Sequence, residues 1–417
     1  MLTIDGAIGP AIADYVEREL RTVKPGEVGL VILRMNTPGG LDTSMRKIIS
    51  AILASPVPVA TYVAPNGARA ASAGTYIAYA SAIAAMAPGT NIGAATPVQL
   101  GGSPLFPNGK PSEHSGQTKG QNEPADAESR KILNDAVAYI RGLANLHHRN
   151  ADWAAEAVRN AASVPAPEAL KLNVVDVIAD DIPDLLRKID GRTVVVGGKP
   201  ERLATAGLDV VSQAPDWRTE FLAVITAPNI AFILLTVGVF GLIFEFFSPG
   251  MIAPGLVGAI SLIVALYALN LLPINYAGVA LVLLGIGLMV AEVHIGALGL
   301  VGLAGIAAFV IGAIMMFPAG VPGFALSPLV AMGVAVVIGG FFVLVLSMLL
   351  RSRKRAVITG EEGLIGSEGE TVSWQDKEGR VRVNGEIWRA RAARVLQSGS
   401  RIKVVDREGL VLIVEAA

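Results

Sequence analysis

The sequence predicts an α/β domain followed by a helical transmembrane bundle and a small all-β barrel. Three observations support this order. Strand-like runs of β-branched residues alternate with helix-period segments in residues 1–200. Apolar stretches of membrane-spanning length fill residues 229–350, and glycine-punctuated alternating runs fill residues 357–417. We expect residues 201–228 to form a linker and pre-membrane segment.

The composition is typical of a membrane protein. Hydrophobic residues make up 52% of the 417 residues and charged residues 17%, with a net charge of −1, so no nucleic-acid partner is indicated. The sequence contains no cysteine, which excludes a thiol nucleophile and a disulfide and leaves the redox compartment open. We expect no cofactor and no metal.

The first domain is predicted as a layered α/β structure. Gly29–Arg34 and Val57–Val63 are strand-like, and Asp42–Ala54 has helical spacing. Pro167 opens a later helix that precedes the apolar run Val174–Ile178. Such an alternation implies helices packed on a sheet, but a fold class does not by itself specify a function.

Two motifs in this domain together indicate a serine nucleophile. In Asn36-Thr37-Pro38-Gly39-Gly40, the proline fixes one turn angle and the glycines free the next two, so backbone N–H groups can point at a substrate carbonyl oxygen. In Ala70-Ala71-Ser72-Ala73-Gly74, Ser72 precedes a helical pattern, and a helix N-terminus favours developing negative charge. Each motif alone is typical of an ordinary turn or cap; the pair predicts a nucleophile beside an oxyanion hole.

Two further motifs, Tyr62–Pro65 and Met86–Gly93, accompany this pair, and the serine motif extends over Gly67–Thr75. Together the four motifs resemble the NfeD family of membrane-bound serine proteases. The resemblance implies a ClpP/crotonase-like spiral protease domain, membrane helices and an OB-type barrel. It also implies a Ser-Lys dyad, cleavage of hydrophobic segments of membrane proteins, a stomatin (SPFH-type) membrane protein as partner or substrate, and a homo-oligomer.

The general base is the open question in this site. His294 lies in an apolar segment, His114 lies in a Gly/Ser/Pro-rich stretch, and His147 and His148 end a helical pattern, where histidines commonly face solvent. By resemblance, a triad histidine would follow the Met86–Gly93 motif, where the sequence reads Ala94-Ala95-Thr96-Pro97. We therefore expect a lysine, and the candidates are Lys110, Lys119, Lys131, Lys171, Lys188 and Lys199.

We favour Lys131 among these lysines. It opens a helical pattern that runs through Leu143, and it shares a stripe with Ala138 and Gly142, whose small side chains let a neighbour approach. The resemblance agrees, because the dyad lysine of the family matches the start of this helix. Without the resemblance, an ordinary surface lysine is the better interpretation. The preceding low-complexity segment Gly101–Ala127 is the natural place for a mobile flap.

The expected chemistry requires a neutral lysine. The unperturbed pKa of a lysine is about 10.4, so a lysine base near neutral pH requires depression by about three units through burial or a cationic neighbour. The alanines around Ser72 fit a dry pocket of this kind. Lys131 would take the Ser72 hydroxyl proton, and the backbone N–H groups of Gly40 and Ala73 would hold the oxyanion.

Five apolar stretches are near spanning length, and tight turns separate them. The basic cluster Arg351–Arg355 follows the last stretch, so we expect the C-terminal end in the cytoplasm of a multi-pass cell-membrane protein. An odd number of spans then places the N-terminal domain outside. Export needs a signal, and the chain begins in a strand-like pattern, so we expect the natural product to start upstream. The stretches are Ile230–Phe247, Ile252–Leu271, Tyr276–Val293, Ala297–Phe317 and Ser327–Leu350.

Three ionisable residues, Glu245, Glu292 and His294, lie in or beside these stretches. Ionisable groups in a membrane are functional candidates by default. Each of the three is also near a predicted segment end, where it could reach the interface or cap a turn, and we favour this interpretation.

The last part is predicted as a closed barrel of about five strands. Gly379–Trp388, Arg401–Val405 and Leu410–Val414 alternate in polarity, and the segment carries nine Lys/Arg against ten Asp/Glu, so no cationic groove for nucleic acid is evident. Trp374 and Trp388 are expected in the core rather than as stacking platforms, which favours a protein-interaction module.

The sequence leaves two alternatives to a protease. One is a catalytically silent membrane scaffold for the stomatin-type partner. The other is a crotonase-like acyl-CoA enzyme, because that class shares the spiral fold and a backbone oxyanion hole.

Overall fold

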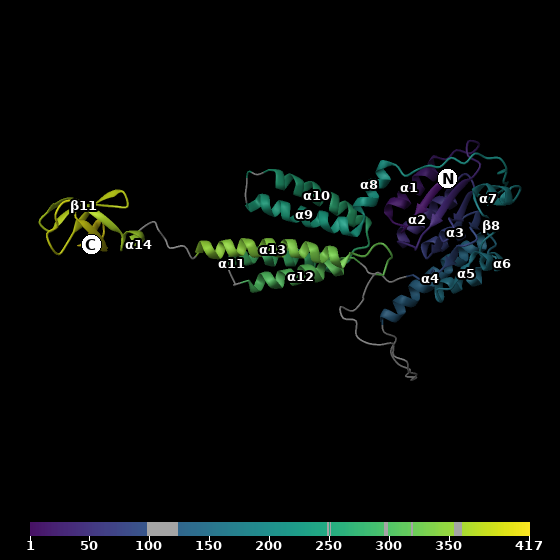
Figure 1. Cartoon of the computed structure of the whole chain (residues 1–417). Helices are drawn as coiled ribbons and strands as arrows, with labels where there is room; N and C mark the ends of the chain where they lie inside the picture. The colour runs from purple at the N-terminus through teal and green to yellow at the C-terminus, as the bar shows by residue number, and fades with distance from the viewer. Residues whose placement is uncertain (98–123, 248–249, 251, 296–298, 318–319, 354–360) are drawn as a thin grey trace, which may run out of the picture. The chain divides into compact units, whose positions relative to one another are not determined.

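The structure is a computed structural model that describes residues 1–97, 124–247, 250, 252–295, 299–317, 320–353 and 361–417. The chain divides into two compact units, Met1–Gly339 and Gly340–Ala417. The first unit holds the N-terminal α/β domain and most of the apolar helices, and the second ends in the barrel (Figure 1).

A parallel five-stranded sheet forms the centre of the N-terminal domain, in the order β1-β2-β3-β5-β8. Side chains of successive residues leave opposite faces of a strand, so alternate residues enter two different cores. Leu33 and Met35 of β2 belong to one apolar cluster, whereas Ile32 belongs to the other. Burial on both faces explains the continuous apolar runs in the sequence. The strands are Leu2–Asp5, Val31–Asn36, Val59–Val63, Ile83–Met86 and Val177–Ile178.

A second, three-stranded sheet in the order β4-β6-β7 lies beside the first. The chain adds one strand to the small sheet after β3 and another after β5, so successive turns of the chain build both sheets together. This is the predicted ClpP/crotonase-like spiral, and the fold class is confirmed. The strands are β4 Arg69–Ala71, β6 Asn91–Gly93 and β7 Ser163–Pro165.

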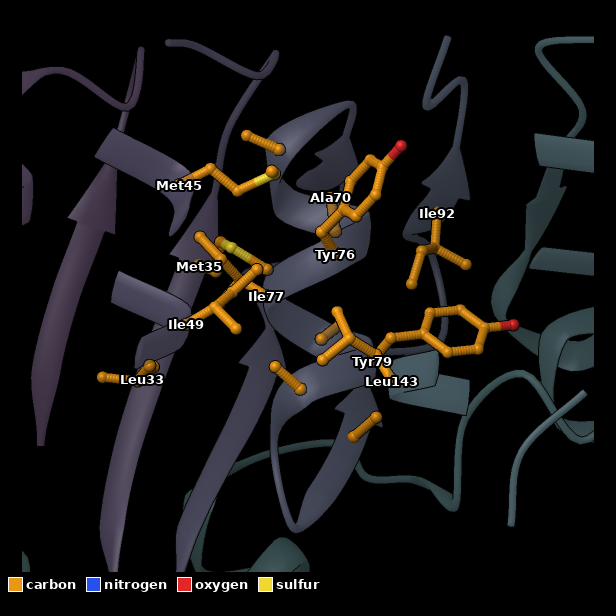
Figure 2. Close-up of a cluster of buried hydrophobic side chains, with 14 of the residues drawn as sticks. Leu33, Met35, Met45, Ile49, Ala70, Tyr76, Ile77, Tyr79, Ile92 and Leu143 are labelled. Carbon is orange, nitrogen blue, oxygen red and sulfur yellow. The ribbon is translucent and has the colours of Figure 1, made fainter. Parts of the chain in front are cut away.

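Helices cover both faces of the central sheet. The observed α2 has the predicted bounds, Asp42–Ala54, and the larger core joins α2, α3 and α4 to the sheet. Figure 2 shows Met35 of β2 next to Ile49 of α2 and Ile77 of α3 within this core. The remaining elements are α1 Pro10–Thr22, α3 Ala73–Ala80, α4 Pro124–Leu146, α5 Ala151–Arg159, α6 Ala166–Lys171, α7 Ile182–Ile189, β9 Thr193–Val196, β10 Lys199–Arg202 and α8 Trp217–Ile225.

A buried arginine fixes the C-terminal end of α3. The guanidinium of Arg149 donates hydrogen bonds to the carbonyl oxygens of Ala78 at 3.0 Å, Tyr79 at 3.1 Å and Ser81 at 2.9 Å. It also pairs with the Asp176 carboxylate at 2.6 Å. Because a cation is favourable at a helix C-terminus, this cluster holds the helix whose other end begins after Ser72.

Five apolar helices follow, and each overlaps one predicted stretch. By length and composition, α9 and α10 are long and apolar enough to cross a membrane, whereas the apolar parts described in α11, α12 and α13 are shorter. The helices are α9 Pro228–Phe247, α10 Ala253–Leu271, α11 Tyr276–Ile295, α12 Leu300–Met316 and α13 Pro328–Arg353.

The hairpins α9–α10 and α11–α12 repeat one pattern of glutamate and glycine. Each has a glutamate near the end of its first helix, a glycine seven residues earlier, and glycines ten and thirteen residues later. The earlier glycine lies against the residue seventeen positions after the glutamate, which is Leu262 beside Gly238 in one hairpin and Phe309 beside Gly285 in the other. A Cβ on either glycine would come within 3.0 Å of the partner backbone, so close helix packing requires glycine here.

The glutamates of the two hairpins differ in the hydrogen bonds that they accept. Glu292 is fully buried, and its carboxylate accepts hydrogen bonds from the N–H groups of Gly299 at 2.8 Å, Val301 at 3.1 Å and Gly302 at 3.2 Å, at the start of α12. Glu245 accepts one bond, from Gly250 at 3.4 Å. The capping interpretation is confirmed for Glu292. The side chain of His294 lies outside the described residues.

The C-terminal part is a closed five-stranded barrel in the order β11-β12-β13-β15-β14, preceded by the short helix α14, Glu361–Leu364. Only β13 and β15 pair in parallel, as in an OB fold. Trp374 and Trp388, predicted in the core, are half-buried and pack against it from outside. The strands are Glu368–Gln375, Glu378–Val383, Glu386–Arg391, Arg401–Glu408 and Val411–Ala416.

Candidate active site

Ser72 lies on a sharp turn between β4 and α3. Its backbone angles are φ 53° and ψ −117°, which L-residues rarely adopt, and it is the N-cap residue of α3. Its N–H donates to the Gly93 carbonyl at 3.0 Å. The Thr75 hydroxyl contacts the carbonyl oxygens of Ala70 and Gly93, both at 2.9 Å, and ties the turn to β6. A strand, a strained serine and a helix in this order form the arrangement of a nucleophile elbow.

The small residues of both motifs are required by close packing around this turn. Gly39 has φ 116°, and a Cβ there would lie 2.6 Å from the Ser72 Cβ and 3.0 Å from its Oγ. A Cβ on Gly74 would lie 2.6 Å from the Thr37 side chain. The glycine after Pro38 and the Ala/Gly neighbours of Ser72 therefore let the two loops meet, and the structure brings the two sequence motifs together.

The two predicted oxyanion donors, the N–H groups of Gly40 and Ala73, lie on either side of this junction. Ile8 pairs with the Gly40 segment by donating to the Gly39 carbonyl at 2.8 Å and accepting from Leu41 at 2.9 Å, which leaves the Gly40 N–H out of the ladder. Ala73 is the first residue of α3, where N–H groups have no helical acceptor. Among the described residues, neither N–H donates a hydrogen bond, so both are available to an oxygen of a ligand.

Ser72, Ala73 and Gly40 line one cavity of about 490 Å³. Tyr76 of α3 and Ala136 of α4 contribute to its wall. The turn after α10, residues 270–273, also lines it. The volume is that of a site for a side chain or a short peptide segment.

Arg46 joins two sides of this cavity. It pairs with Asp42 on its own helix and with Asp135 of α4, both at 2.9 Å, and its guanidinium lies 4.4 Å from the Tyr139 ring centre. Tyr139 stacks on Tyr76 with ring centres 6.1 Å apart. Burial raises the pKa of Tyr76 above its ordinary value, so this side chain stays a neutral hydroxyl. Together these contacts hold α4 against α2 and α3.

Lys131 does not reach the cavity in the described structure. It lies in the second turn of α4, because the helix begins at Pro124 rather than at the lysine as predicted, and its side chain is exposed. Ala138 is exposed too, and no atom of the described residues lies within 4 Å of a Cβ placed on Gly142, so the close neighbour expected along this stripe is not found there. The role of Lys131 as base stays a prediction.

Sequence reasoning missed a lysine that does line the cavity. Lys47 lies on α2, seven residues after Gly40, and borders the same space as Ser72. Lys47 precedes Ser72 in the sequence, whereas the lysines predicted as candidates for the base all follow it. The signal available in the sequence was the helical periodicity of α2, which starts two residues after the glycine motif and has Lys47 in its second turn.

The described histidines lie away from the cavity. The His147 ring nitrogen Nε2 contacts the Ala80 carbonyl at 3.0 Å, and burial, together with the charge of Arg149, lowers the pKa of His147 to about 4. His148 is exposed. His114, Lys110, Lys119 and nearly all of the predicted flap Gly101–Ala127 lie outside the described residues; the last residues of the flap segment begin α4. In the part of the chain that the structure describes, no group of three or more His, Asp or Glu could hold a metal ion.

Three family models match successive parts of the chain. They are the NfeD1b N-terminal domain at residues 1–192, the NfeD integral membrane domain at 229–348, and the NfeD-like C-terminal, partner-binding domain at 361–415. Membrane-bound protease PH1510 from Pyrococcus horikoshii is 35% identical over 99% of this chain and 91% of its own length. The chain belongs to the NfeD family. NfeD1b from Bacillus subtilis is 28% identical over 74% of this chain and 65% of that protein.

Two solved structures are similar to the N-terminal part of this NfeD protein. One is the 1510-N membrane-bound stomatin-specific protease, in a variant with a substrate peptide, with a TM-score of 0.45 and 36% identity over 53% of this chain and 94% of that chain. The other is the 1510-N membrane protease specific for a stomatin homolog from Pyrococcus horikoshii, with a TM-score of 0.43 and 32% identity over 54% and 96% of the two chains. The match to the N-terminal family model covers both residues of the predicted dyad, Ser72 and Lys131.

Proposed function

We propose that this NfeD protein is a membrane-bound serine endopeptidase with Ser72 as its nucleophile. The observation that carries the proposal is the geometry of Ser72, a serine in a strained elbow at a helix N-terminus, beside two unused N–H groups and a cavity of about 490 Å³. Strained backbone conformations cluster at active sites, where the surrounding structure holds them in place, so the strain at Ser72 supports a functional role. The similarity to a protein named a membrane-bound protease agrees with this proposal.

In the proposed mechanism, a neutral lysine takes the proton of the Ser72 hydroxyl as Oγ attacks a peptide carbonyl. The oxyanion receives hydrogen bonds from the N–H groups of Gly40 and Ala73. The protonated lysine then gives its proton to the leaving amine, and water hydrolyses the acyl-enzyme with the lysine as base again. A helix dipole at α3 further favours the negative charge.

We assign the base to Lys131, with Lys47 as the alternative. The resemblance to the Ser-Lys family members supports Lys131, and α4 borders the cavity at Ala136. Lys131 lies about 7.5 Å before Ala136 along the helix axis and about 140° around the helix from it, so the role of base requires the first turns of α4 to rearrange. The position of Lys47 supports the alternative, since it already lines the cavity.

We further propose a stomatin (SPFH-type) membrane protein as partner or substrate, cleaved in a hydrophobic segment. The support is the name of the similar 1510-N structures and the partner-binding description of the family model that matches the barrel. We propose a homo-oligomer on the family resemblance. We also propose that the N-terminal domain lies outside the cytoplasm and the barrel inside it; the support is the basic cluster Arg351–Arg355, which follows the last apolar helix.

A fluorophosphonate probe on the full chain in detergent tests both the nucleophile and the base. We expect labelling of the wild type, loss in Ser72→Ala, and strong loss in Lys131→Ala and in Lys131→Arg, because arginine does not deprotonate in this range. Lys47→Ala is the matched control and should retain labelling. Loss in Lys47→Ala with retention in Lys131→Ala would transfer the role of base to Lys47. A folded wild type that neither labels nor cleaves would favour the scaffold.

A further inference from the structure

Helix α8, Trp217–Ile225, presents two opposite faces. Its inner residues Thr219, Leu222 and Ile225 are at most 6% exposed. Trp217 and Phe221, by contrast, are 78% and 48% exposed. The inner residues are apolar or small because they pack on α1. In the described part of the chain, no packing contact accounts for the apolar residues on the outer face.

The outer apolar residues form one narrow stripe. At about 100° per residue, Trp217, Phe221 and Val224 fall within an arc of about 60°, whose centre is about 130° around the helix from the centre of the buried face. Val224 is 57% exposed. Charged side chains flank the stripe, Glu220 on one side and Arg218 on the other, and Arg218 is paired with Asp14 at 3.2 Å. An apolar stripe with a tryptophan and charged flanks is typical of a helix that lies in a membrane interface.

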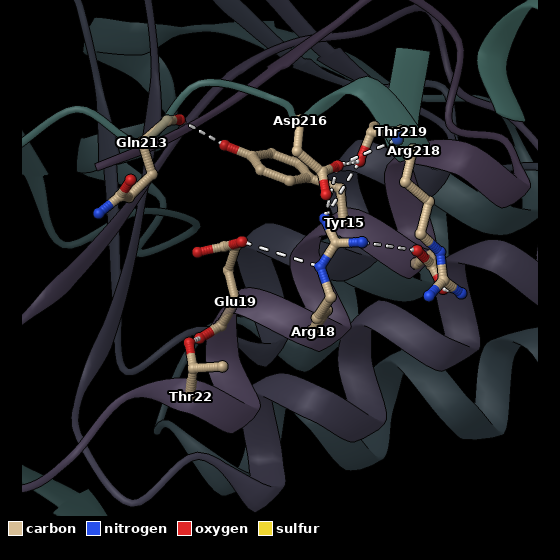
Figure 3. Close-up of polar contacts among 9 residues, drawn as sticks. Tyr15, Arg18, Glu19, Thr22, Gln213, Asp216, Arg218 and Thr219 are labelled. Carbon is tan, nitrogen blue, oxygen red and sulfur yellow. Dashed lines mark hydrogen bonds and ion pairs between the residues drawn. The ribbon is translucent and has the colours of Figure 1, made fainter. Parts of the chain in front are cut away.

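Polar contacts hold α8 rigidly on the N-terminal domain (Figure 3). Asp216, the N-cap residue of α8, accepts from the Thr219 N–H at 3.0 Å and pairs with Arg18 of α1 at 2.9 Å. Just before the helix, the Tyr15 hydroxyl donates to the Gln213 carbonyl at 2.6 Å. The stripe is therefore a fixed surface of the α/β domain and not part of a loose linker.

The stripe is also next to the membrane. Helix α9 begins at Pro228, three residues after α8 ends, and the family model of the integral membrane domain begins at residue 229. The exposed side chains of α9 are apolar as well, Ile233 and Val237 among them. In Figure 1, α8 does not continue the direction of α9. Because tryptophan side chains favour the headgroup region, and the chain here enters the bilayer, lipid is the occupant that continuity with α9 indicates.

We propose that Trp217, Phe221 and Val224 insert into the lipid headgroup region and fix the N-terminal domain against the membrane surface. The proposal does not depend on the chemistry at Ser72. Its consequence is that α8 acts as an interfacial anchor, so the domain is held at the bilayer by a face as well as by the chain connection to α9.

Fluorescence quenching by brominated phosphatidylcholine tests this anchor. The full chain is reconstituted into vesicles with bromine at shallow or deep acyl positions, and the Trp217 signal is the difference between wild type and Trp217→Phe. The membrane segments contain no tryptophan, so the other three residues, Trp153, Trp374 and Trp388, contribute equally to both proteins. We expect a blue-shifted Trp217 emission that shallow bromine quenches more strongly than deep bromine. A water-like emission with no quenching would overturn the proposal.

A matched control places a tryptophan at the opposite edge of the domain. Leu170 of α6 is 41% exposed, and α6 packs beside β8, at the edge of the sheet opposite to β1. Leu170→Trp in the Trp217→Phe background should show no quenching. A second variant, Phe221→Ser with Val224→Ser, keeps Trp217 and the inner face and should reduce quenching. If vesicles leave Trp217 unquenched while this variant lowers the oligomeric mass in detergent, the face is a contact between copies and the lipid anchor is wrong.

Discussion

The backbone of Ser72 stores strain that a substitution can release. At φ 53° a side chain with a Cβ is unfavourable, by about 1–3 kcal/mol, whereas glycine adopts this region freely. Ser72→Ala removes the hydroxyl but keeps the Cβ, so it should leave the strain unchanged. The free energy of unfolding of Ser72→Gly should therefore exceed that of Ser72→Ala by about 1 kcal/mol, after the larger entropy of glycine in the unfolded chain is subtracted. Ser72→Gly should then unfold at a higher denaturant concentration. Chemical denaturation of both variants checks this; equal stability would mean that the turn is relaxed.

A second prediction at the residue scale concerns His147 and pH. Its folded pKa is about 4, below the ordinary value of 6.5, so between these values the unfolded chain binds more protons at this group. The stability that it contributes is complete above about pH 6.5 and falls as the pH drops toward 4. The slope is at most about 1.4 kcal/mol per pH unit, and less because the ring is partly solvated.

The test compares denaturation of the wild type and His147→Gln at several pH values between 4 and 7. The variant should be less stable at pH 7 and should lose less stability on acidification, because glutamine does not titrate. Carboxylates that titrate in this range cancel in the difference between the two proteins. Parallel pH curves for the two proteins would show that His147 is not responsible.

At the same scale, the sequence predicted that the two motifs meet, but not which lysine lies beside the cavity. Ser72 and Gly40 follow from local rules, since proline, glycine and alanine at these positions report on turns and close approach directly. The base does not, because a lysine on an amphipathic helix has the same sequence pattern whether it is solvated or catalytic. The same limit explains why Lys47 was missed, since its place beside the cavity depends on how α2 packs.

At the scale of elements, the two glutamate caps give a matched pair. Glu292 satisfies three N–H groups at the start of α12, whereas Glu245 accepts one long bond in the corresponding hairpin. Gly299 and Gly302 are buried, so loss of the carboxylate would leave their N–H groups without this acceptor. Glu292→Ala should therefore destabilise the helical domain by about 1–3 kcal/mol, and Glu245→Ala by less. Unfolding in mixed detergent, followed by helical circular dichroism, measures the difference. A larger loss for Glu245→Ala than for Glu292→Ala would show that the number of N–H groups bound by the carboxylate does not determine the loss of stability.

Elements with strong apolar periodicity were predicted well. The bounds of α2 agree because apolar positions recur at helical spacing from Met45 to its last turn. All five apolar stretches match a helix, because a helix satisfies its backbone hydrogen bonds within one segment. The start of α4 was missed, since its first turns, from Pro124 to Arg130, carry polar and alanine residues without an apolar stripe. The repeated hairpin pattern escaped sequence analysis because it rests on a glutamate and three glycines, and its meaning comes from the packing between helices.

At the scale of the whole molecule, the path of the chain determines which side of the membrane each part occupies. In the proposed orientation, the hairpins α9–α10 and α11–α12 each return to the side on which they start, so α13 would make the crossing that separates the N-terminal domain from the barrel. With 26 residues, α13 is about 39 Å long, against about 30 Å for the hydrocarbon core. The same proposal puts its cytoplasmic end at the cluster that begins with Arg351. The order of the three parts could be predicted from composition. That α13 is the apolar helix outside the two hairpins became clear only from the pairing of the other four helices.

The orientation is testable because the chain has no cysteine, so a single introduced thiol reports on one position. Ser50 of α2 and Ser398 of the barrel are both exposed. A membrane-impermeant maleimide should label Ser50→Cys in intact cells, and it should label Ser398→Cys only after the membrane is opened. Replacing the arginines and lysine of the cluster by glutamine should weaken this difference, because the positive charges that retain the barrel are gone. Labelling of both positions from one side would mean that α13 does not cross, and the N-terminal domain and the barrel would then share a compartment.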